Sequence, residues 1–197
     1  MSYSSGGSIM SSQRFSVRVV LVLLVWCLTA TVLGGLSVVA SLHPPFPQAI
    51  LFGLVALLLT AYGLSSEFRG WLASIPFEWL VSIHLVRFVG FYFLWLYQRR
   101  QLPFAFAVPG GWADILIATL ALVLLVLRPR SRVIYQVWNA LGFVDILFVV
   151  GTATRLALAD PASMTALLRL PLSLLPTFIV PLIIFTHIVI YLRLRGA

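Results

Sequence analysis

The amino-acid sequence predicts an all-α fold: a polytopic transmembrane bundle of six helices, with the amino and carboxyl termini both in the cytoplasm. Of its 197 residues, 61% are hydrophobic and 9% are charged, whereas a soluble domain carries roughly a quarter charged residues. Six apolar stretches approach the length of about 20 residues that a helix needs to cross a bilayer. These stretches occupy most of the chain, which leaves no room for a separate soluble domain.

The chain is expected to consist of a short tail and one domain. Residues 1–15 are rich in Ser and Gly, so we expect a disordered cytoplasmic tail. Residues 16–197 are expected to form one six-helix transmembrane domain. The first apolar stretch also resembles a secretory signal peptide, but its length disfavours cleavage after Ala40. The six helices are predicted at about 19–41, 48–64, 77–98, 112–127, 133–154 and 170–192.

Prolines and charged residues set the boundaries of these helices. The proline-rich segment 43–47 ends the first helix, because prolines remove amide donors and favour extended backbone. Two prolines and a Gly pair predict an irregular connection over 99–111, so the fourth helix is expected to start at Trp112. The Arg-Pro-Arg-Ser-Arg run at 128–132 predicts a tight basic turn. Two prolines within the sixth helix are expected to kink it and to free carbonyl groups.

The arginines predict the orientation. Eight lie on one side of the six predicted spans: Arg14, Arg18, Arg69, Arg128, Arg130, Arg132, Arg193 and Arg195. Four lie on the other side: Arg99, Arg100, Arg155 and Arg169. Because cytoplasmic loops carry the excess of basic residues, the first set is placed in the cytoplasm. We expect the protein in the bacterial inner (plasma) membrane.

Composition excludes several classes of function. All thirteen basic residues are arginine, so a retinal or pyridoxal Schiff base, which needs a lysine amine, is excluded. Cys27 is the sole cysteine, which rules out an intrachain disulfide. The net charge of +8 lies at helix ends, so the expected partners are the lipid bilayer and anionic lipid headgroups, and no nucleic acid. Homo-oligomerisation or membership of a larger membrane complex stays open.

Two histidines are predicted at matched depth on different helices. His84 lies six residues after Glu78, and His187 lies six residues before Arg193, which puts each about 9 Å below the same surface at 1.5 Å per residue. They could ligate the iron of one b-type haem, bind a quinone or hold a metal. The alternative is that each hydrogen-bonds a neighbouring helix, as polar residues in membrane bundles do.

A charged pair is predicted in the bundle interior. Arg87 lies one turn beyond His84 on the same face of the third helix, and its guanidinium cannot be neutralised by deprotonation. It needs an anion, for which Asp145 near the middle of the fifth helix is the best candidate. Asn139, Gly142 and Asp145 form a small and polar stripe suited to close helix contact. The pair is as compatible with a static strut as with proton or solute handling.

The remaining carboxylates are assigned to helix caps. Asp114 is placed at the outer start of the fourth helix, where it would satisfy free amides and the helix dipole. Glu78 is given the same role at the start of the third helix. Asp114 would then lie too far from Asp145 for the two to share a proton, which sets aside an aspartyl protease. The hydrolase and phosphate-binding motifs are absent from the sequence, so we identify no catalytic residue.

These residues predict an intramembrane polar pocket lined by His84, Arg87, Asn139, Asp145 and His187. The leading hypothesis is a small proton- or anion-coupled transporter or permease, because ionisable residues inside a membrane mark solute and proton pathways. A redox protein holding one b-type haem or quinone between the two histidines is the second hypothesis. A non-catalytic assembly subunit of a membrane complex is the third.

Overall fold

The computed structural model describes residues 5–196, with side chains from residue 15 onward, and this part of the chain is helical without strands. Six helices or helix runs are long and apolar enough to cross a membrane. Their bounds are Phe15–Gly35, Phe46–Leu64, Phe77–Gln98, Phe104–Leu127, Arg132–Ala159 and Leu175–Gly196. The predicted all-α fold and the predicted number of apolar helices are therefore confirmed.

The elements follow one another with short connections. The α-helices are α1 (Ser5–Gly35), α2 (Phe46–Leu64), α3 (Ser66–Ser74), α4 (Phe77–Ser82), α5 (Gly90–Gln98), α6 (Phe104–Leu127), α7 (Arg132–Ala159) and α8 (Val180–Gly196). The 3-10 helices are η1 (Val39–Ser41), η2 (Ile83–Val89) and η3 (Pro161–Leu168), and η4 (Leu175–Ile179) is a π-helix. The third span consists of α4, η2 and α5, and the sixth consists of η4 and α8.

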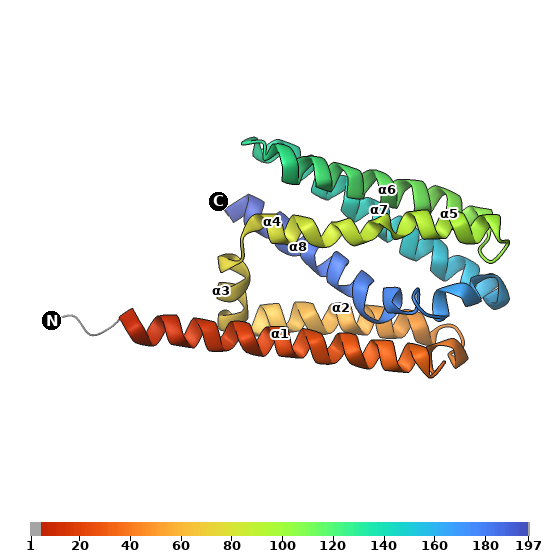
Figure 1. The fold of residues 1–197 in the computed structure, drawn as a ribbon, viewed down its shortest axis with the longest axis horizontal. Helices are drawn as coiled ribbons and strands as arrows, with labels where there is room; N and C mark the ends of the chain where they lie inside the picture. The colour runs from red at the N-terminus through yellow and green to blue at the C-terminus, as the bar shows by residue number, and fades with distance from the viewer. Residues whose placement is uncertain (1–4, 197) are drawn as a thin grey trace.

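Successive spans run in alternating directions, so α1 starts and α8 ends at the same end of the molecule (Figure 1). The spans α4–α5, α6 and α7 pack together, and α8 contacts α7 and α2. The α1–α2 pair lies along one side (Figure 1) and is joined to the rest through η4, α8 and α3. Trp26 of α1 fixes this attachment, because its indole donates a hydrogen bond of 2.8 Å to the Thr177 carbonyl in η4.

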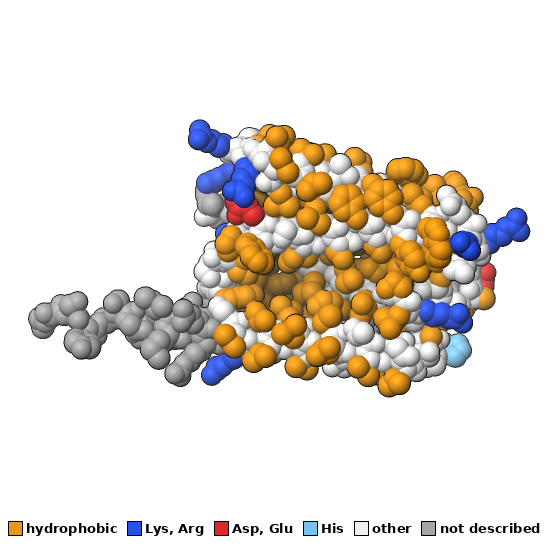
Figure 2. All heavy atoms as spheres, viewed as in Figure 1, with side chains coloured by type: hydrophobic (Ala, Val, Ile, Leu, Met, Phe, Trp, Pro, Cys, Tyr) orange, Lys and Arg blue, Asp and Glu red, His pale blue; other side chains and the backbone are white. Residues whose placement is uncertain are grey.

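The surface of the bundle is apolar. Figure 2 shows hydrophobic side chains over most of the visible face, with arginines gathered at its two ends. In the most apolar 18-residue segment of the first span, only 11% of the residues are buried inside the molecule. The share is the same in the second span. Such a large exposed apolar surface is unfavourable in water. Helices of this length match the hydrocarbon core of a bilayer, which would surround that surface.

Several predicted helix bounds were wrong, and among them α1 ends at Gly35 instead of residue 41 and α7 ends at Ala159 instead of residue 154. The fourth helix begins at Phe104, eight residues before the expected start at Trp112, and it continues through Pro109. A proline within a membrane helix is tolerated because neighbouring groups satisfy the carbonyl that it frees. The last span begins at Leu175, five residues later than expected, because residues 170–173 form turns after η3. The first helix begins earlier than residue 19, at Ser5.

The predicted tail also differs from the structure. Helix α1 begins at Ser5, so helix occupies most of the segment 1–15 for which disorder was expected, and residues 1–4 lie outside the described residues.

Close contact between the third and fourth spans explains the Gly pair that suggested an irregular loop. A Cβ added to Gly111 would lie 2.9 Å from the Gly90 carbonyl oxygen, and a Cβ on Gly90 would strike the Gly111 carbonyl. Glycines at both positions therefore let the two backbones approach each other, as small residues do in membrane bundles. This contact holds α5 and η2 against α6 at the level of the polar residues.

Candidate functional site

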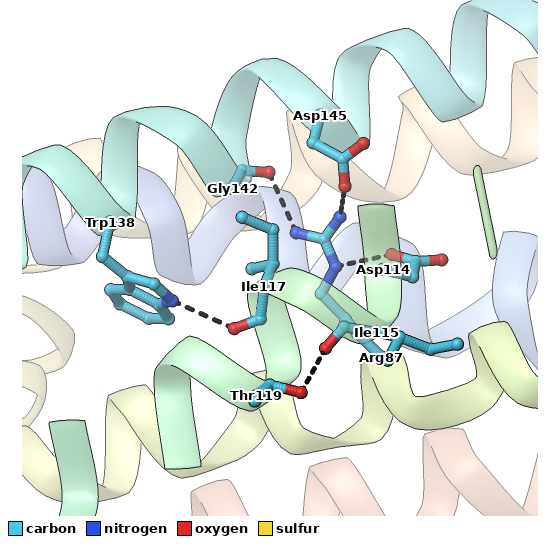
Figure 3. A network of polar contacts seen from close by, with 8 residues as sticks. All are labelled: Arg87, Asp114, Ile115, Ile117, Thr119, Trp138, Gly142 and Asp145. Carbon is cyan, nitrogen blue, oxygen red and sulfur yellow. Dashed lines mark hydrogen bonds and ion pairs between the residues drawn. The ribbon is translucent and has the colours of Figure 1, made fainter. Parts of the chain in front are cut away.

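A guanidinium bridges three spans in the centre of the bundle. Arg87 in η2 donates a hydrogen bond from Nε to Asp114 Oδ1 in α6 at 2.6 Å, and its Nη2 forms an ion pair with Asp145 Oδ2 in α7. Its Nη1 donates to the Gly142 carbonyl at 3.0 Å. Figure 3 shows the guanidinium between the two carboxylates. We call Arg87, Asp114 and Asp145 the ion-pair triad.

The triad is shielded from the outside to different degrees. The side chains of Arg87, Asp114 and Asp145 are 1%, 5% and 12% exposed. A buried charge is stable only when it is paired and hydrogen-bonded, and Arg87 meets this condition with three separate acceptors. The predicted pair of Arg87 with Asp145 is present in the structure, and a second carboxylate joins it.

Asp114 does not cap a helix, so that prediction was wrong. Because α6 starts at Phe104, Asp114 lies ten residues inside it, which corresponds to about 15 Å along the axis. Its carboxylate therefore reaches the depth of Asp145 and binds the same guanidinium. The expected separation of the two aspartates was wrong as well, although Arg87 stands between them. Glu78 lies in the first turn of its helix, α4, where its charge interacts with the helix dipole, but the N-cap residue is Pro76 and no side-chain capping hydrogen bond is formed there.

The local backbone around Arg87 is unusual. Residues 83–89 form a 3-10 helix within an otherwise α-helical span. A 3-10 stretch in the middle of a helix is often a hinge or a strained segment, because its hydrogen-bond geometry is poorer than that of an α-helix. Arg87, the cationic side chain in the interior of the third span, thus lies on the 3-10 segment of that span.

The two histidines meet one layer away from the triad. The rings of His84 and His187 have centroids 4.2 Å apart, and both residues are buried. Asn139 holds His187 from two sides: its Oδ1 lies 2.8 Å from the ring Nδ1, and its Nδ2 donates to the His187 carbonyl at 3.0 Å. Thr186 Oγ1 lies 3.4 Å from His84 Nε2. His84 Nδ1 and His187 Nε2 have no hydrogen-bond partner.

The histidine arrangement does not fit a haem. Two imidazoles that ligate one iron stand on opposite faces of the porphyrin, whereas these two rings are in van der Waals contact with each other. Trp138 and Phe143 pack against the same rings and fill the surrounding space. Among the described residues, no three His, Cys, Asp or Glu side chains gather as a metal site. The haem version of the redox hypothesis therefore has no site between these helices.

A cavity of about 300 Å³ reaches the triad from one side. Its walls are mainly apolar and come from η1, α2, η2, α5, α6, α7, η3, η4 and α8, together with the connection between η1 and α2. Arg87 and Asp114 are the two formally charged residues that line it. Figure 2 shows a hollow with an apolar floor between the α1–α2 pair and the α4–α5 helices. At the arginine-poor end the cavity is bordered by the exposed residues His43, Pro161 and Ala162.

The predicted polar pocket is thus a packed polar cluster beside a largely apolar cavity. All five residues named from the sequence lie together in the interior, but of these five only Arg87 lines the cavity. His84, Asn139 and His187 hydrogen-bond or stack on neighbouring side chains instead. A Cβ on Gly142 would lie 2.7 Å from His187 Cε1, so the glycine is what allows this imidazole to pack against α7.

Asp114 and Gln48 are the cavity residues that sequence reasoning missed. For Asp114 a signal was present: Gly111 precedes it by three residues, as Gly142 precedes Asp145. A glycine one turn before a carboxylate opens space for a partner on the neighbouring helix, and the same pattern occurs on both helices that bind Arg87. Gln48 near the start of α2 carried no comparable signal.

Comparison with known proteins identifies a family. Residues 44–195 match the family described as Domain of unknown function (DUF8737). The chain belongs to this family. The matched region runs from just before α2 to the end of α8 and includes the whole triad, both buried histidines and Gln48. No curated protein matches the chain, and no solved structure does.

Proposed function

We propose that this member of the DUF8737 family is an integral membrane transporter that couples solute movement to protons at the ion-pair triad. The observation that carries the proposal is one guanidinium held between two carboxylates at the inner end of a cavity. Ionisable residues in membrane interiors are costly and mark proton or substrate pathways. A strut that only joins helices would need one carboxylate and no adjoining cavity.

Charge favours a proton over an anion as the coupling ion. When both carboxylates are ionised, the triad holds one positive and two negative charges, so it has an excess negative charge inside a low-dielectric bundle. A proton on Asp114 or Asp145 removes this excess, whereas an anion would add to it. Of the proton- and anion-coupled versions suggested by the sequence, the geometry therefore supports the first.

Exchange of partners by Arg87 would supply the conformational step. Protonation of one aspartate weakens its ion pair, which leaves the guanidinium to the other aspartate and to the Gly142 carbonyl. The two aspartates lie on α6 and α7, and Arg87 lies on a 3-10 segment that can absorb backbone change. The other titratable groups near the triad are His84 and His187, which contact each other and do not line the cavity.

Reconstituted protein tests this function. Liposomes containing the purified protein and a pH-sensitive dye would receive butylguanidinium, methanesulfonate, alanine or glucose, none of which crosses lipid rapidly. A transporter of this kind should move protons across the membrane with at least one of the four, beyond the signal of protein-free liposomes. Asp114→Asn and Asp145→Asn should abolish that signal, and the matched control Glu67→Gln, at an exposed site on α3, should retain it.

Two results would contradict the proposal. One is the absence of a coupled proton signal with every solute although the wild-type protein is folded in the liposomes. The other is a wild-type signal in both aspartate variants. Stoichiometric co-purification of partner proteins together with either result would favour the assembly-subunit hypothesis.

We also propose that the end carrying the starts of α1 and α7 faces the cytoplasm, as the arginine distribution predicts. Cys27 is the sole cysteine, so Cys27→Ser gives a background for single-cysteine labelling. In intact cells, a membrane-impermeant maleimide should label Ser163→Cys in η3 and should label Ser131→Cys, at the start of α7, only after lysis. The reverse pattern would invert the orientation.

A further inference from the structure

We propose that the cavity is a binding site for amphiphilic organic cations, in which an ammonium group pairs with Asp114 and an apolar body lies against the cavity walls. This inference names the substrate class of the same site, so its physiological meaning rests on the proposed transport function. Binding of a ligand to the cavity can be tested without any transport measurement.

The first argument is the balance of charge at the inner end of the cavity. Asp114 lines the cavity and contributes Oδ1 to Arg87 Nε. Arg87 also serves Asp145 and the Gly142 carbonyl, so its donors are divided among three acceptors. One cation thus faces two carboxylates, and a second cation is what the site lacks. An anionic or neutral ligand would leave the excess negative charge uncompensated.

The second argument is independent of the triad and concerns Gln48. Its side-chain oxygen Oε1 is buried, has no hydrogen-bond partner, and belongs to a residue that lines the cavity. Leaving a buried acceptor unpaired costs roughly 1–3 kcal/mol. An amide oxygen accepts and cannot donate, so the group that satisfies it carries an N–H or O–H. Among the polar groups that line the cavity, the Asp114 carboxylate and the Gln48 amide oxygen are both acceptors, and each would bind a ligand group that donates a hydrogen bond.

The third argument is the apolar wall. Between Gln48 and the triad the cavity is lined by side chains such as Leu51, Phe93, Phe106 and Ile146. Its volume of about 300 Å³ is at the lower end of the range of roughly 300–1,000 Å³ for small-molecule sites. A small inorganic cation would gain nothing from such walls, whereas an alkyl or aryl group gains about 25 cal/mol for each Å² of apolar surface that it buries.

The surroundings of the cavity suit a ligand that arrives from the lipid phase. Val86 lines the cavity next to Arg87 and is 38% exposed. His43 and Pro161 border it at the arginine-poor end of the bundle and are also exposed. An amphiphile partitions to the membrane surface, from which either border can be reached.

The proton and the organic cation would compete for the same carboxylate. With the site empty, a proton on Asp114 removes the excess negative charge. When an ammonium ion enters, that proton leaves, and the total charge of the occupied site stays the same. No covalent bond other than the O–H bond of the carboxyl group breaks, and the proton passes to solvent. This exchange would make the transporter an antiporter of protons and organic cations.

A matched series of ligands tests the inference on detergent-purified full-length protein. The probes are 4-phenylbutylamine, 4-phenylbutanol and 4-phenylbutyrate, which share one apolar body and differ in the charge of the head group. Isothermal titration calorimetry should show binding of the amine, with the alcohol and the carboxylate about tenfold or more weaker, in line with the strength of charge-assisted hydrogen bonds. Equal binding of all three, or preference for the carboxylate, would overturn the inference.

Variants locate the site. Asp114→Asn should weaken amine binding by about tenfold to a hundredfold, and Gln48→Leu by about threefold to tenfold, with little effect on the alcohol. Ala153→Phe, which places a ring in the cavity wall, should reduce binding of all three ligands. Glu67→Gln is the control and should bind as the wild type does. Unchanged amine affinity in Asp114→Asn protein that retains its fold would contradict the assignment.

The two proposals can fail separately. Selective amine binding without coupled proton movement in liposomes would support the proposed binding site and contradict the proposed transport function. Proton movement coupled to methanesulfonate but not to butylguanidinium would support transport and contradict the assignment of the substrate as a cation.

Discussion

Replacing Arg87 by methionine separates a cost in stability from a loss of function. The change keeps a long side chain in the interior but removes the guanidinium that serves Asp114, Asp145 and the Gly142 carbonyl. Two carboxylates with 5% and 12% exposed side chains then remain without a cation. Removing one partner of a buried ion pair costs about 3–5 kcal/mol, and we expect a loss of free energy of unfolding in this range.

The companion variant removes all three charges. Arg87→Met combined with Asp114→Leu and Asp145→Leu leaves no unpaired charge, and replacement of buried ionic groups by apolar ones is often neutral or stabilising by roughly 1–4 kcal/mol. The triple variant should therefore regain most of the stability that the single variant loses. It should still show no coupled proton movement, because the proton-binding groups are gone.

Unfolding in mixed detergent micelles, followed by tryptophan fluorescence, measures these free energies. Trp138 is buried beside the polar cluster and donates a hydrogen bond of 3.2 Å to the Ile117 carbonyl, as Figure 3 shows. Its emission is therefore expected to report on the core. The reasoning is refuted if the single variant loses less than about 1 kcal/mol, which is the ordinary effect of a point mutation, or if the triple variant is no more stable than the single one.

Three further substitutions test the packing around the cluster. Gly142→Ala adds a Cβ 2.7 Å from a histidine ring carbon and should cost about 1–3 kcal/mol by overpacking; the control Gly53→Ala, where nothing lies within 4 Å, should be neutral or slightly stabilising in the same unfolding assay. Asn139→Leu removes two hydrogen bonds to His187 and should cost about 1–2 kcal/mol, whereas Gln136→Leu on the exposed face of the same helix should not. Trp26→Phe removes the donor to η4 and should speed limited proteolysis between α1 and α2; an unchanged digestion rate would show that this bond does not hold the first span.

The sequence predicted the fold class well because the period and length of apolar stretches depend on the chain alone. It also predicted the ion pair between Arg87 and Asp145, since a guanidinium in an apolar span must find an anion and few are available. These two inferences need only local composition and the cost of burying charge.

The errors arose where packing between helices decided the outcome. Pro109 and the following glycines were interpreted as a loop, but Gly111 faces Gly90 across a close helix contact and the helix continues through this segment. The late start assigned to α6 then placed Asp114 at a cap instead of beside Arg87. The histidines were expected to flank a cofactor, whereas the space between them is closed by direct ring contact.

The cavity could not be predicted because its walls come from nine separate elements. Gln48 is 98 or more residues from the α7 and η4 side chains that line the same cavity, and its unpaired oxygen is evident only in three dimensions. Sequence periodicity identifies which face of a helix is apolar, but it does not reveal where two apolar faces fail to meet.

The count of protons released when an organic cation binds tests the central claim most directly. Weakly buffered protein in detergent, with a pH-sensitive dye, is titrated with 4-phenylbutylamine in its ammonium form. Competition at Asp114 predicts about one proton released for each amine bound, by linkage between the two equilibria, and no release from Asp114→Asn protein. Binding of the amine without release of protons at any pH tested would contradict the account.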